Sequence, residues 1–535
     1  MIKRFFAYIV LPALCCAHCA AAVAAEPPRL VINIVAGSLD AGSLARYTPN
    51  FGERGFKRLL EEGAVFENAR YGCMQTTTPV SLATISTGAT PAIHGVTGDR
   101  WVDPSTNKVV ELTADTRSHS VLNRDGEGGH SPANLIAPTL ADAMMRADSS
   151  SRAVTVAVEP MSAVVLAGRS GTCLWIDPKA CRWTTSTAYA SALPGWVSAY
   201  NGRDWQTRFL TGPWTSRYGN IMYLNKRRYD ITMNDSATGT AKSRAAALRK
   251  LSDYEKIAQT PAGNSILLDF ARTVVASLDL GGDKHPDLLN IYFDAPRNIA
   301  ERYGTESVEY EDMLYRLDSD LGEFLDYVNA YVKNKEAVLV VFTADHGSSP
   351  SFDLVEHDER DRFNARQFEV IMNAYIGAKF GQGEWVTGYM NHALYINRNL
   401  AHERNIPIAD IQDEAAMFAT QFRGISHAMS ARSLASGAFA NGYARKMQNG
   451  YFPRRSGDVL INLMPDWIEQ RDDIRSMSGS MYEYDVHVPL IFCGAGIKAA
   501  KHKQHTDMTS VAPTIASILG IMLPSAAEGE ILDMK

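Results

Sequence analysis

A threonine followed by a proline, Thr78 and Pro79, opens the apolar stretch VSLATISTG, which ends at Gly88. Thr as N-cap, Pro at the first helical position and Gly at the end predict a helix that begins here. A hydroxyl at that place lies in the positive field of the helix start, where free backbone N–H groups favour an anion. It could therefore act as a nucleophile toward a phosphate group. A plain capping threonine is the alternative, because Thr is a preferred N-cap in any helix.

Short apolar runs are predicted to be the strands that position such a site. They alternate with helical patterns, among them FKRLLEEG from Phe56 and a long one from Glu309. This alternation predicts an α/β protein with a doubly wound, mostly parallel sheet, whose chemistry lies just beyond the carboxyl ends of the strands. The predicted strands are LVINIVA (30–36), AVTVAV (153–158), DLLNIYF (287–293) and AVLVVFT (337–343).

The regular alternation breaks in three stretches, at about 100–135, 170–285 and 350–455. They have an irregular pattern, and we interpret them as insertions that cap the site. No linker rich in Gly, Ser or charge divides the chain of 535 residues, so one large domain over 26–535 is expected.

Longer motifs resemble a known family. From Phe51 the chain reads FGERGFKRLLEEGAVFENARYGCMQTTTPVSLATISTGATPAIHGVTGDRWVD, and later FTADHG, SVEYEDMLYRLDSDLGEF, RSGDV and YDVHVPLIFCGAGIK. These segments resemble the phosphate-irrepressible periplasmic alkaline phosphatases of the alkaline phosphatase superfamily, close to the type I phosphodiesterases and nucleotide pyrophosphatases. The resemblance runs in order from Leu30 to MTSVAPTIASILGI near the C-terminus. It implies an α/β/α sandwich with a mostly parallel central sheet and capping insertions.

The resemblance also implies a site with two zinc ions, a threonine nucleophile, and three Asp and three His ligands. Two metal ions clamp the attacking and leaving oxygens of an in-line displacement. Thr78 matches the nucleophile position, and Asp345 and His346 in FTADHG match two of the ligands. The other ligand positions of the family fall on residues of the wrong type, namely Gly37, Arg297, Glu301 and Ser478.

The phosphate-clamping positions of the family are altered as well. Its Asn corresponds to Asp99, and its Lys and Arg correspond to Glu159 and Met161. Arg297 cannot lose its proton to become a ligand, and two dications with so few donors would leave a large uncompensated charge. Arg297 and Glu301 are spaced i, i+4, so we expect an ion pair between them if their segment is helical. Two solvated side chains are the alternative.

Two nearby carboxylates offer a poor rescue of the metal site. Asp40 lies three positions after Gly37, and Asp294 lies three positions before Arg297. Metal ligands must be placed within about 0.2 Å of standard distances, so an offset carboxylate is a weak substitute. No cofactor is therefore expected, and the alternative is zinc at incomplete occupancy.

Three functions follow as hypotheses. The leading one is a catalytically inactive pseudophosphatase with a binding or scaffold role. The second is residual or altered hydrolysis of phosphate mono- or diesters with Thr78 as nucleophile. The third is a metal-independent protein that binds an anion through Arg297, Asp99 and Thr78, since Arg suits bidentate recognition of oxyanions.

The first 25 residues predict export. Lys3 and Arg4 precede an apolar run that ends in a small-residue stretch before Glu26, the pattern of a secretory signal peptide. We expect a periplasmic or secreted protein without an integral membrane segment, whose partner is an anionic ligand or a periplasmic protein. The dispersed net charge of −6 argues against a nucleic-acid-binding surface.

In an oxidising compartment Cys173 and Cys181, which bracket a hairpin-like segment, could form a disulfide; two reduced thiols are the alternative.

Overall fold

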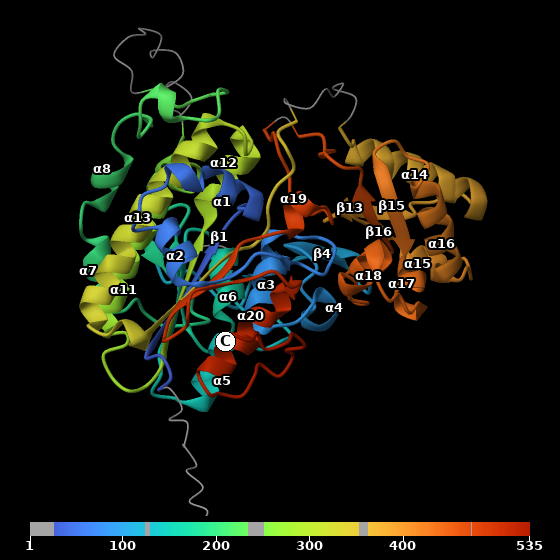
Figure 1. The fold of residues 1–535 in the computed structure, drawn as a ribbon. Helices are drawn as coiled ribbons and strands as arrows, with labels where there is room; N and C mark the ends of the chain where they lie inside the picture. The colour runs from blue at the N-terminus through green and yellow to red at the C-terminus, as the bar shows by residue number, and fades with distance from the viewer. Residues whose placement is uncertain (1–25, 123–128, 234–250, 353–361, 472, 535) are drawn as a thin grey trace, which may run out of the picture.

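The computed structural model describes residues 26–122, 129–233, 251–352, 362–471 and 473–534. The predicted signal peptide lies outside them. A nine-stranded sheet forms the centre of the molecule (Figure 1). Five neighbouring strands, from β9 to β12, run parallel, and β17 is antiparallel to β12. In spatial order the strands are β10 (Trp183–Thr184), β9 (Thr172–Ile176), β8 (Ala153–Ala157), β11 (Asp287–Phe293), β1 (Leu30–Ala36), β12 (Val338–Ala344), β17 (Leu490–Gly494), β2 (Ala64–Phe66) and β18 (Ala500–His502).

The central strands are apolar along their whole length because helices cover both faces of the sheet. All seven residues of β1, of β11 and of β12 are buried. Continuous apolar runs of this kind are typical of parallel strands buried on both sides. The predicted ranges of β1 and β11 agree with the structure residue for residue, and those of β8 and β12 agree to within one residue.

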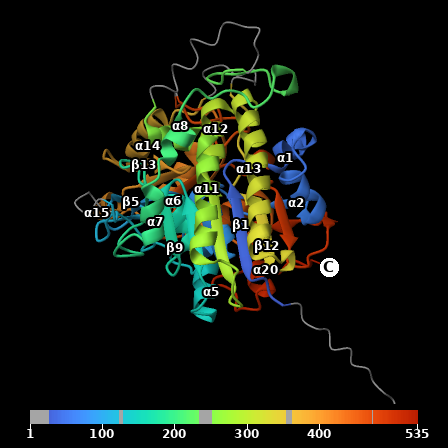
Figure 2. The ribbon, with the colours of Figure 1, turned by 90° about the vertical axis from the view of Figure 1, so that its left-hand side faces the viewer.

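Two helical layers complete the α/β/α sandwich, so the predicted fold class is confirmed. Figure 2 shows the long helices of one layer lying along the sheet. That layer contains α2 (Phe56–Glu62), α11 (Ala262–Leu278) and α13 (Val308–Val332), with α1 (Ala41–Tyr47) and α12 (Asp294–Tyr303) near one edge of the sheet. The opposite layer contains α3 (Thr78–Thr87), α5 (Leu140–Ala147), α6 (Pro160–Ala167) and α20 (Val511–Ile518).

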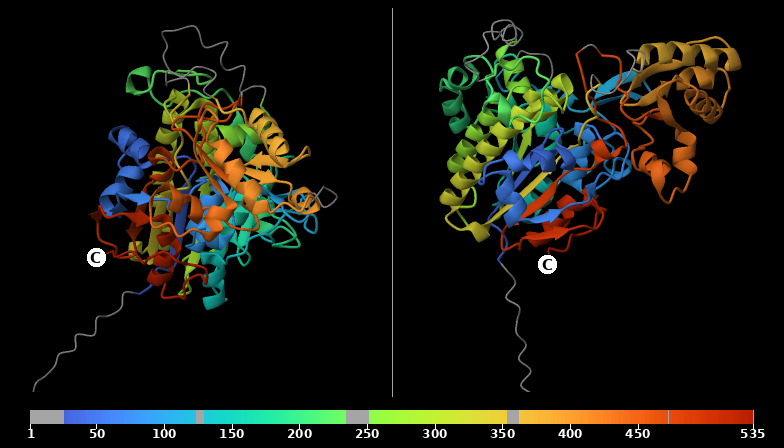
Figure 3. Two further views of the ribbon diagram at one scale, coloured as in Figure 1. Left: turned by 90° about the vertical axis from the view of Figure 1, so that its right-hand side faces the viewer. Right: turned by 45° about the horizontal axis from the view of Figure 1, so that its top comes forward.

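A second lobe projects from the side of the sandwich (Figure 3). It is built on an antiparallel four-stranded sheet and has its own apolar core, which includes Phe368, Trp385 and Ile411. Its strands are β13 (Val386–Met390), β14 (Ala393–Ile396), β16 (Val459–Leu463) and β15 (Ile425–Ser430), and its helices are α14 (Ala365–Phe380), α15 (Arg398–Glu403), α16 (Ile408–Ala419), α17 (Ala431–Ser436) and α18 (Gly442–Asn449).

The three stretches interpreted as insertions have different positions. The stretch at 100–135 holds the hairpins β4 (Arg100–Asp103) with β5 (Lys108–Glu111) and β6 (Ala114–Asp115) with β7 (Gly129–His130). Most of the second lobe falls within 350–455. The stretch at 170–285 is not an insertion throughout, because β9, β10 and α11 belong to the central layers; α7 (Gly195–Asn201), α8 (Trp205–Leu210) and α10 (Asp253–Gln259) lie outside the sheet.

The disulfide considered between Cys173 and Cys181 is not present, and both cysteines are free thiols. The predicted hairpin does form, but its register pairs Ile176 with Trp183. Cys181 therefore lies in the turn, whereas Cys173 lies three residues further down the strand. Within the described ranges, no helix has the length and apolar character needed to span a membrane.

Candidate functional site

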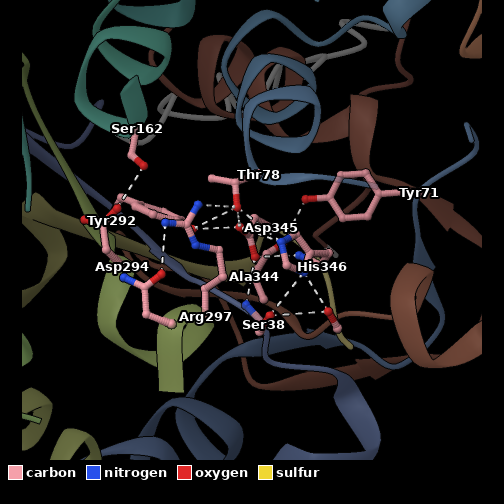
Figure 4. A network of polar contacts seen from close by, with 12 residues as sticks. Ser38, Tyr71, Thr78, Ser162, Tyr292, Asp294, Arg297, Ala344, Asp345 and His346 are labelled. Carbon is pink, nitrogen blue, oxygen red and sulfur yellow. Dashed lines mark hydrogen bonds and ion pairs between the residues drawn. The ribbon is translucent and has the colours of Figure 1, made fainter. Parts of the chain in front are cut away.

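Three neighbouring strands end in register and define the edge of the sheet where the candidate site lies. The last residue of β1 is paired with the last residues of β11 and β12. Gly37, Asp294 and Asp345 therefore follow their strands at the same carboxyl edge. Helix α3 begins beside this edge and brings Thr78 to it (Figure 4).

Thr78 is the first residue of α3, whereas the N-cap is Thr77, which makes no side-chain capping hydrogen bond. The predicted helix is thus correct, but the predicted cap is one residue off. The Thr78 hydroxyl donates to Asp345 Oδ2 over 2.7 Å and lies 3.2 Å from His346 Nε2. Its side chain therefore contacts the other site residues and does not cap the helix. Thr78 is buried, with only 3% of its surface exposed.

Asp345 is the acceptor at the centre of the site, and no part of it is exposed. Its Oδ1 accepts the backbone N–H groups of Ser38 and His346 over 2.9 and 2.7 Å. Its Oδ2 accepts from the hydroxyls of Thr78 and Tyr292, each over 2.7 Å. Burial and the Asp345 charge raise the pKa of Tyr292 well above its ordinary value, so the phenol remains a donor. The carboxylate thus has four donors from four different segments of the chain.

His346 is oriented by its own chain. Its Nδ1 lies 2.6 Å from the carbonyl oxygen of Gly347 and 3.3 Å from Ser38 Oγ. A carbonyl only accepts, so the proton of the ring lies on Nδ1. Its Nε2 lies 3.2 Å from the Thr78 hydroxyl and also 3.2 Å from Asp345 Oδ2.

Arg297 brings a guanidinium into the space beside the nucleophile position. Its Nη1 lies 3.3 Å from Thr78 Oγ1, and its Nη2 lies 2.7 Å from a carboxylate oxygen of Glu159 (Figure 4 shows Arg297 directed at Thr78). The expected ion pair with Glu301 is wrong: the carboxylate within ion-pair distance of Arg297 in the described part of the chain is that of Glu159. Glu301 lies one turn further along α12, and its backbone carbonyl accepts from the N–H of Arg475.

Glu159 and Arg297 hold each other in the charged state. Burial by itself would raise the pKa of Glu159, but the Arg297 guanidinium and the amide of Asn298 hold that pKa below its ordinary value. The Asn298 Nδ2 donates to Glu159 Oε1 over 3.0 Å. Burial would likewise lower the pKa of Arg297, and the Glu159 charge keeps it well above the ordinary range. The two side chains form a partly buried ion pair, and Asn298 donates to the second oxygen of the Glu159 carboxylate.

Gly37 is packed too closely for any side chain. A Cβ at this position would lie 2.7 Å from the Cβ of Arg297, 2.9 Å from the hydroxyl of Tyr292 and 3.1 Å from the carbonyl oxygen of Phe293. Contacts below 3.0 Å force the neighbouring atoms to move, and here one neighbour is the first turn of α12. The chain has therefore closed around the position where the family is expected to have an Asp.

We predict that Gly37→Ala lowers the free energy of unfolding by about 1–3 kcal/mol, because the added methyl group overpacks a rigid contact. Gly195→Ala is the matched control. A Cβ at Gly195 meets nothing within 4 Å, and Ala is a better helix residue than Gly, so this variant should be as stable as the wild type or slightly more stable. Chemical denaturation of the three proteins measures the difference. A Gly37→Ala variant as stable as the wild type would show that α12 can move to accommodate the methyl group without loss of stability.

The remaining predicted residues lie at different distances from this centre. Ser478 is half-buried in a loop next to the start of α3, since the adjacent Gly479 would place a Cβ 3.4 Å from Thr77 Cγ2. Met161 is half-buried in the first turn of α6, and Asp99 is exposed. The structure thus brings together Thr78, Asp345, His346, Arg297 and Glu159, and leaves Asp99 at the surface.

Asp40 and Asp294, the two carboxylates considered as substitute metal ligands, both accept hydrogen bonds from the protein. Asp40 caps α1 and accepts the N–H of Ser43 over 2.8 Å. Asp294 is buried and accepts the N–H groups of Val158 and Glu159 over 2.7 and 3.2 Å. Asp294 therefore joins the end of β11 to the start of α6.

Sequence reasoning missed Tyr292, Ser38 and Asn298. Tyr292 stands in the otherwise apolar run DLLNIYF, and a buried tyrosine hydroxyl needs a hydrogen-bond partner, which was the available signal. Ser38 contributes mainly through its backbone N–H, which any residue type could supply. Asn298 stands next to Arg297, but its amide contact with Glu159 depends on the approach of α6 to α12.

Comparisons with known proteins agree with this architecture. The profile of the type I phosphodiesterase / nucleotide pyrophosphatase family matches residues 31–475. A protein of Myroides odoratus named calcium-transporting ATPase is 29% identical over 98% of both chains. Alkaline phosphatase PafA of Elizabethkingia meningoseptica is 28% identical, over 94% of this chain and 93% of that one.

Solved structures agree as well. The crystal structure of wild-type alkaline phosphatase PafA superposes with a TM-score of 0.85 at 27% identity, covering 95% of this chain and 98% of that one. Murine ectonucleotide pyrophosphatase / phosphodiesterase 5 shares the fold, with a TM-score of 0.53 at 11% identity over 94% of this chain and 97% of that one. The chain therefore belongs to the type I phosphodiesterase / nucleotide pyrophosphatase family of the alkaline phosphatase superfamily.

Proposed function

We propose that this protein is an exported pseudophosphatase, which keeps the alkaline phosphatase scaffold for binding and does not carry out two-zinc phosphate ester hydrolysis. The observation that carries the proposal is the Arg297 guanidinium, which lies 3.3 Å from Thr78 Oγ1 and is fixed there by Glu159 at 2.7 Å. A permanent cation occupies the surroundings in which the family is expected to hold metal ions. The nucleophile position is itself buried and engaged by Asp345.

The residues at the site do not fit two zinc ions. Zinc sites normally have three or four protein ligands chosen from Cys, His, Asp and Glu. Within the described residues, no group of three or more such side chains is placed to hold a metal ion. Asp345 and His346 are accompanied instead by two hydroxyls and a guanidinium, and a guanidinium has no lone pair to donate. Zinc at incomplete occupancy would have to rely on Asp345, His346 and Thr78 alone.

A metal-independent hydrolase is the second candidate, and one contact favours it. The Thr78 hydroxyl donates to the Asp345 carboxylate over 2.7 Å, and a carboxylate in that position can take the proton of an attacking hydroxyl. Arg297 could then stabilise the charge that develops on a phosphoryl group. The burial of Thr78 argues against this function, because a substrate must reach the hydroxyl.

Kinetics with two neighbouring threonines separates the two candidates. The test compares wild type, Thr78→Ala and Thr77→Ala with an activated aryl phosphate and an aryl phosphodiester. Thr77 is a matched control because its hydroxyl is buried and has no hydrogen-bond partner in the described part of the chain. We expect the same background hydrolysis in all three proteins. If the wild type and Thr77→Ala both hydrolyse a substrate more than about tenfold faster than Thr78→Ala, the protein is a hydrolase. A tenfold difference in rate corresponds to about 1.4 kcal/mol of barrier.

Metal content supplies an independent test. Wild-type protein loaded with excess zinc and then dialysed is expected to hold well below one zinc ion per chain. Retention of nearly two ions per chain would contradict the pseudophosphatase.

Export is part of the proposal. The charged start, the apolar run and the small-residue stretch of residues 1–25 support secretion or a periplasmic location. The partner in that compartment is an anionic ligand or another periplasmic protein. An N-terminal sequence of the mature protein that begins near Glu26 is the expected outcome, and intact Met1 on purified periplasmic or secreted material would contradict signal-peptide removal.

A further inference from the structure

The carboxylate of Glu159 is held as a bound ligand would be held. One oxygen accepts from the Arg297 guanidinium over 2.7 Å, and the other accepts from the Asn298 amide over 3.0 Å. Both donors come from the first half of α12, whereas Glu159 comes from the loop between β8 and α6. Glu159 is the N-cap residue of α6, yet its side chain makes no capping hydrogen bond. The carboxylate is therefore directed at α12 and not at its own helix.

Arg297 has donor capacity that Glu159 does not use. Its Nε is buried and has no hydrogen-bond partner among the residues that the structure describes. Nη1 reaches Thr78 Oγ1 only at 3.3 Å. A buried donor without an acceptor is costly and rare in native structures, so the guanidinium is incompletely satisfied by the carboxylate it holds.

We propose that Arg297 and Asn298, beside Thr78, form a binding site for a tetrahedral oxyanion, phosphate or sulfate, and that Glu159 is an internal occupant that keeps this site closed. The inference rests on the proposed function, because it requires that no metal ion take the place of Arg297. A carboxylate has two oxygens, and both are already used. A tetrahedral anion has further oxygens, which could accept from the unsatisfied Arg297 Nε and from Nη1, whose contact with Thr78 is long, while the first two replace those of Glu159.

Solvent can reach this ion pair, which makes exchange of the occupant feasible. The side chain of Glu159 is 24% exposed and that of Arg297 is 13% exposed. Thr78 and Asp345 beneath them are buried. An incoming anion therefore meets Glu159 before it meets the rest of the site, and the negative charge of Glu159 repels it.

Removal of the carboxylate is expected to open the site. In Glu159→Ala, inorganic phosphate should bind with a dissociation constant at least about tenfold lower than in the wild type, a change of about 1.4 kcal/mol. Glu159→Gln keeps an amide oxygen that can still accept from Arg297, so its affinity should lie between the two. Sulfate should bind like phosphate, and acetate should bind more weakly because it lacks the additional oxygens. Equilibrium dialysis with labelled phosphate, at constant ionic strength because surface charges are screened by salt, measures all three proteins.

Two controls separate this site from a general effect of an unpaired arginine. The double variant Glu159→Ala with Arg297→Ala should lose the gained affinity. Glu483→Ala removes another carboxylate from an arginine, since Glu483 holds the half-buried Arg70 over 2.9 Å on a different part of the surface. This variant should bind phosphate no better than the wild type. Equal gains in Glu483→Ala and Glu159→Ala would overturn the inference.

The outcomes distinguish the inference from the proposed function. Wild type that binds phosphate as tightly as Glu159→Ala would show that Glu159 does not close the site. Glu159 variants that melt cooperatively, and are therefore folded, but gain no affinity for phosphate would also show that Glu159 does not close the site. A low zinc content of the wild type would still support the pseudophosphatase in that case. If the alanine variant does not fold, the glutamine variant and the wild type decide the question. Two zinc ions per wild-type chain would instead overturn the proposed function, whatever the dialysis shows.

Discussion

Asp345→Ala is expected to lower the free energy of unfolding by about 3–5 kcal/mol. The substitution removes a buried carboxylate that accepts from two backbone N–H groups and from the hydroxyls of Thr78 and Tyr292. Each buried donor that loses its acceptor costs about 1–3 kcal/mol, and His346 can compensate only for Thr78. Chemical denaturation, with the midpoint and the slope both determined, measures the loss.

Asp345→Asn and Asp410→Ala are the matched controls. The amide of Asn keeps an acceptor for the N–H groups of Ser38 and His346, so this variant should lose less than half as much stability. Asp410 is 56% exposed and pairs with Arg432 at 3.4 Å, an arrangement that contributes little, so its removal should change stability by less than about 1 kcal/mol. An Asp345→Ala variant within about 1 kcal/mol of the wild type would show that the hydrogen-bond network around Asp345 does not stabilise the fold.

A chelator distinguishes a structural Asp345 from a metal ligand. If Asp345 stabilises the protein through the four donors, the wild type should melt at the same temperature with and without a chelator. If a bound metal supplied the stability, removal of the metal would lower the melting temperature of the wild type toward that of Asp345→Ala. The second result would contradict the pseudophosphatase.

Restoration of the metal ligands is expected to produce a protein whose stability depends on zinc. The change at residue 37 introduces a Cβ only 2.7 Å from the Cβ of residue 297, and an Asp at 297 retains that Cβ. The first turn of α12 must therefore move, and without zinc the variant should be less stable than the wild type. Zinc at about 100 times its dissociation constant should then add about 2.7 kcal/mol. The variant combines Gly37→Asp, Arg297→Asp, Glu301→His and Ser478→His.

Thermal melts with and without zinc, together with metal analysis, test this variant against the wild type, which should not respond. Hydrolysis should appear only after Asp99→Asn, Glu159→Lys and Met161→Arg are added, because Glu159 repels a phosphoryl group and lost electrostatic stabilisation costs a few kcal/mol of barrier. If the four-residue variant melts cooperatively yet takes up no more zinc than the wild type, the assignment of the ligand positions is wrong. The pseudophosphatase proposal would then lose its basis.

The sequence by itself determined the fold and the edge of the sheet where the site lies. The runs at 30–36 and 287–293 are strands over those ranges, because a parallel strand covered on both faces must be apolar at every position. The ends of such strands are visible as the places where polar residues resume, and the resemblance of FTADHG to the family motif identified Asp345 and His346 at one of them. The start of α3 was also visible, one residue from its true position, because Pro79 and Gly88 mark the ends of the helix.

Only the tertiary structure decided which groups meet at that edge. The i, i+4 spacing on α12 favoured a pair between Arg297 and Glu301, but a helix neighbour gains little in water. The approach of α6 to α12 offered Glu159, which Asn298 also holds, so the long-range pair formed instead. The close contact of Gly37 with α12 likewise depends on how a helix packs on a strand end. Such contacts between segments more than 100 residues apart leave no periodic signal in the sequence, because they are set by the packing of whole elements.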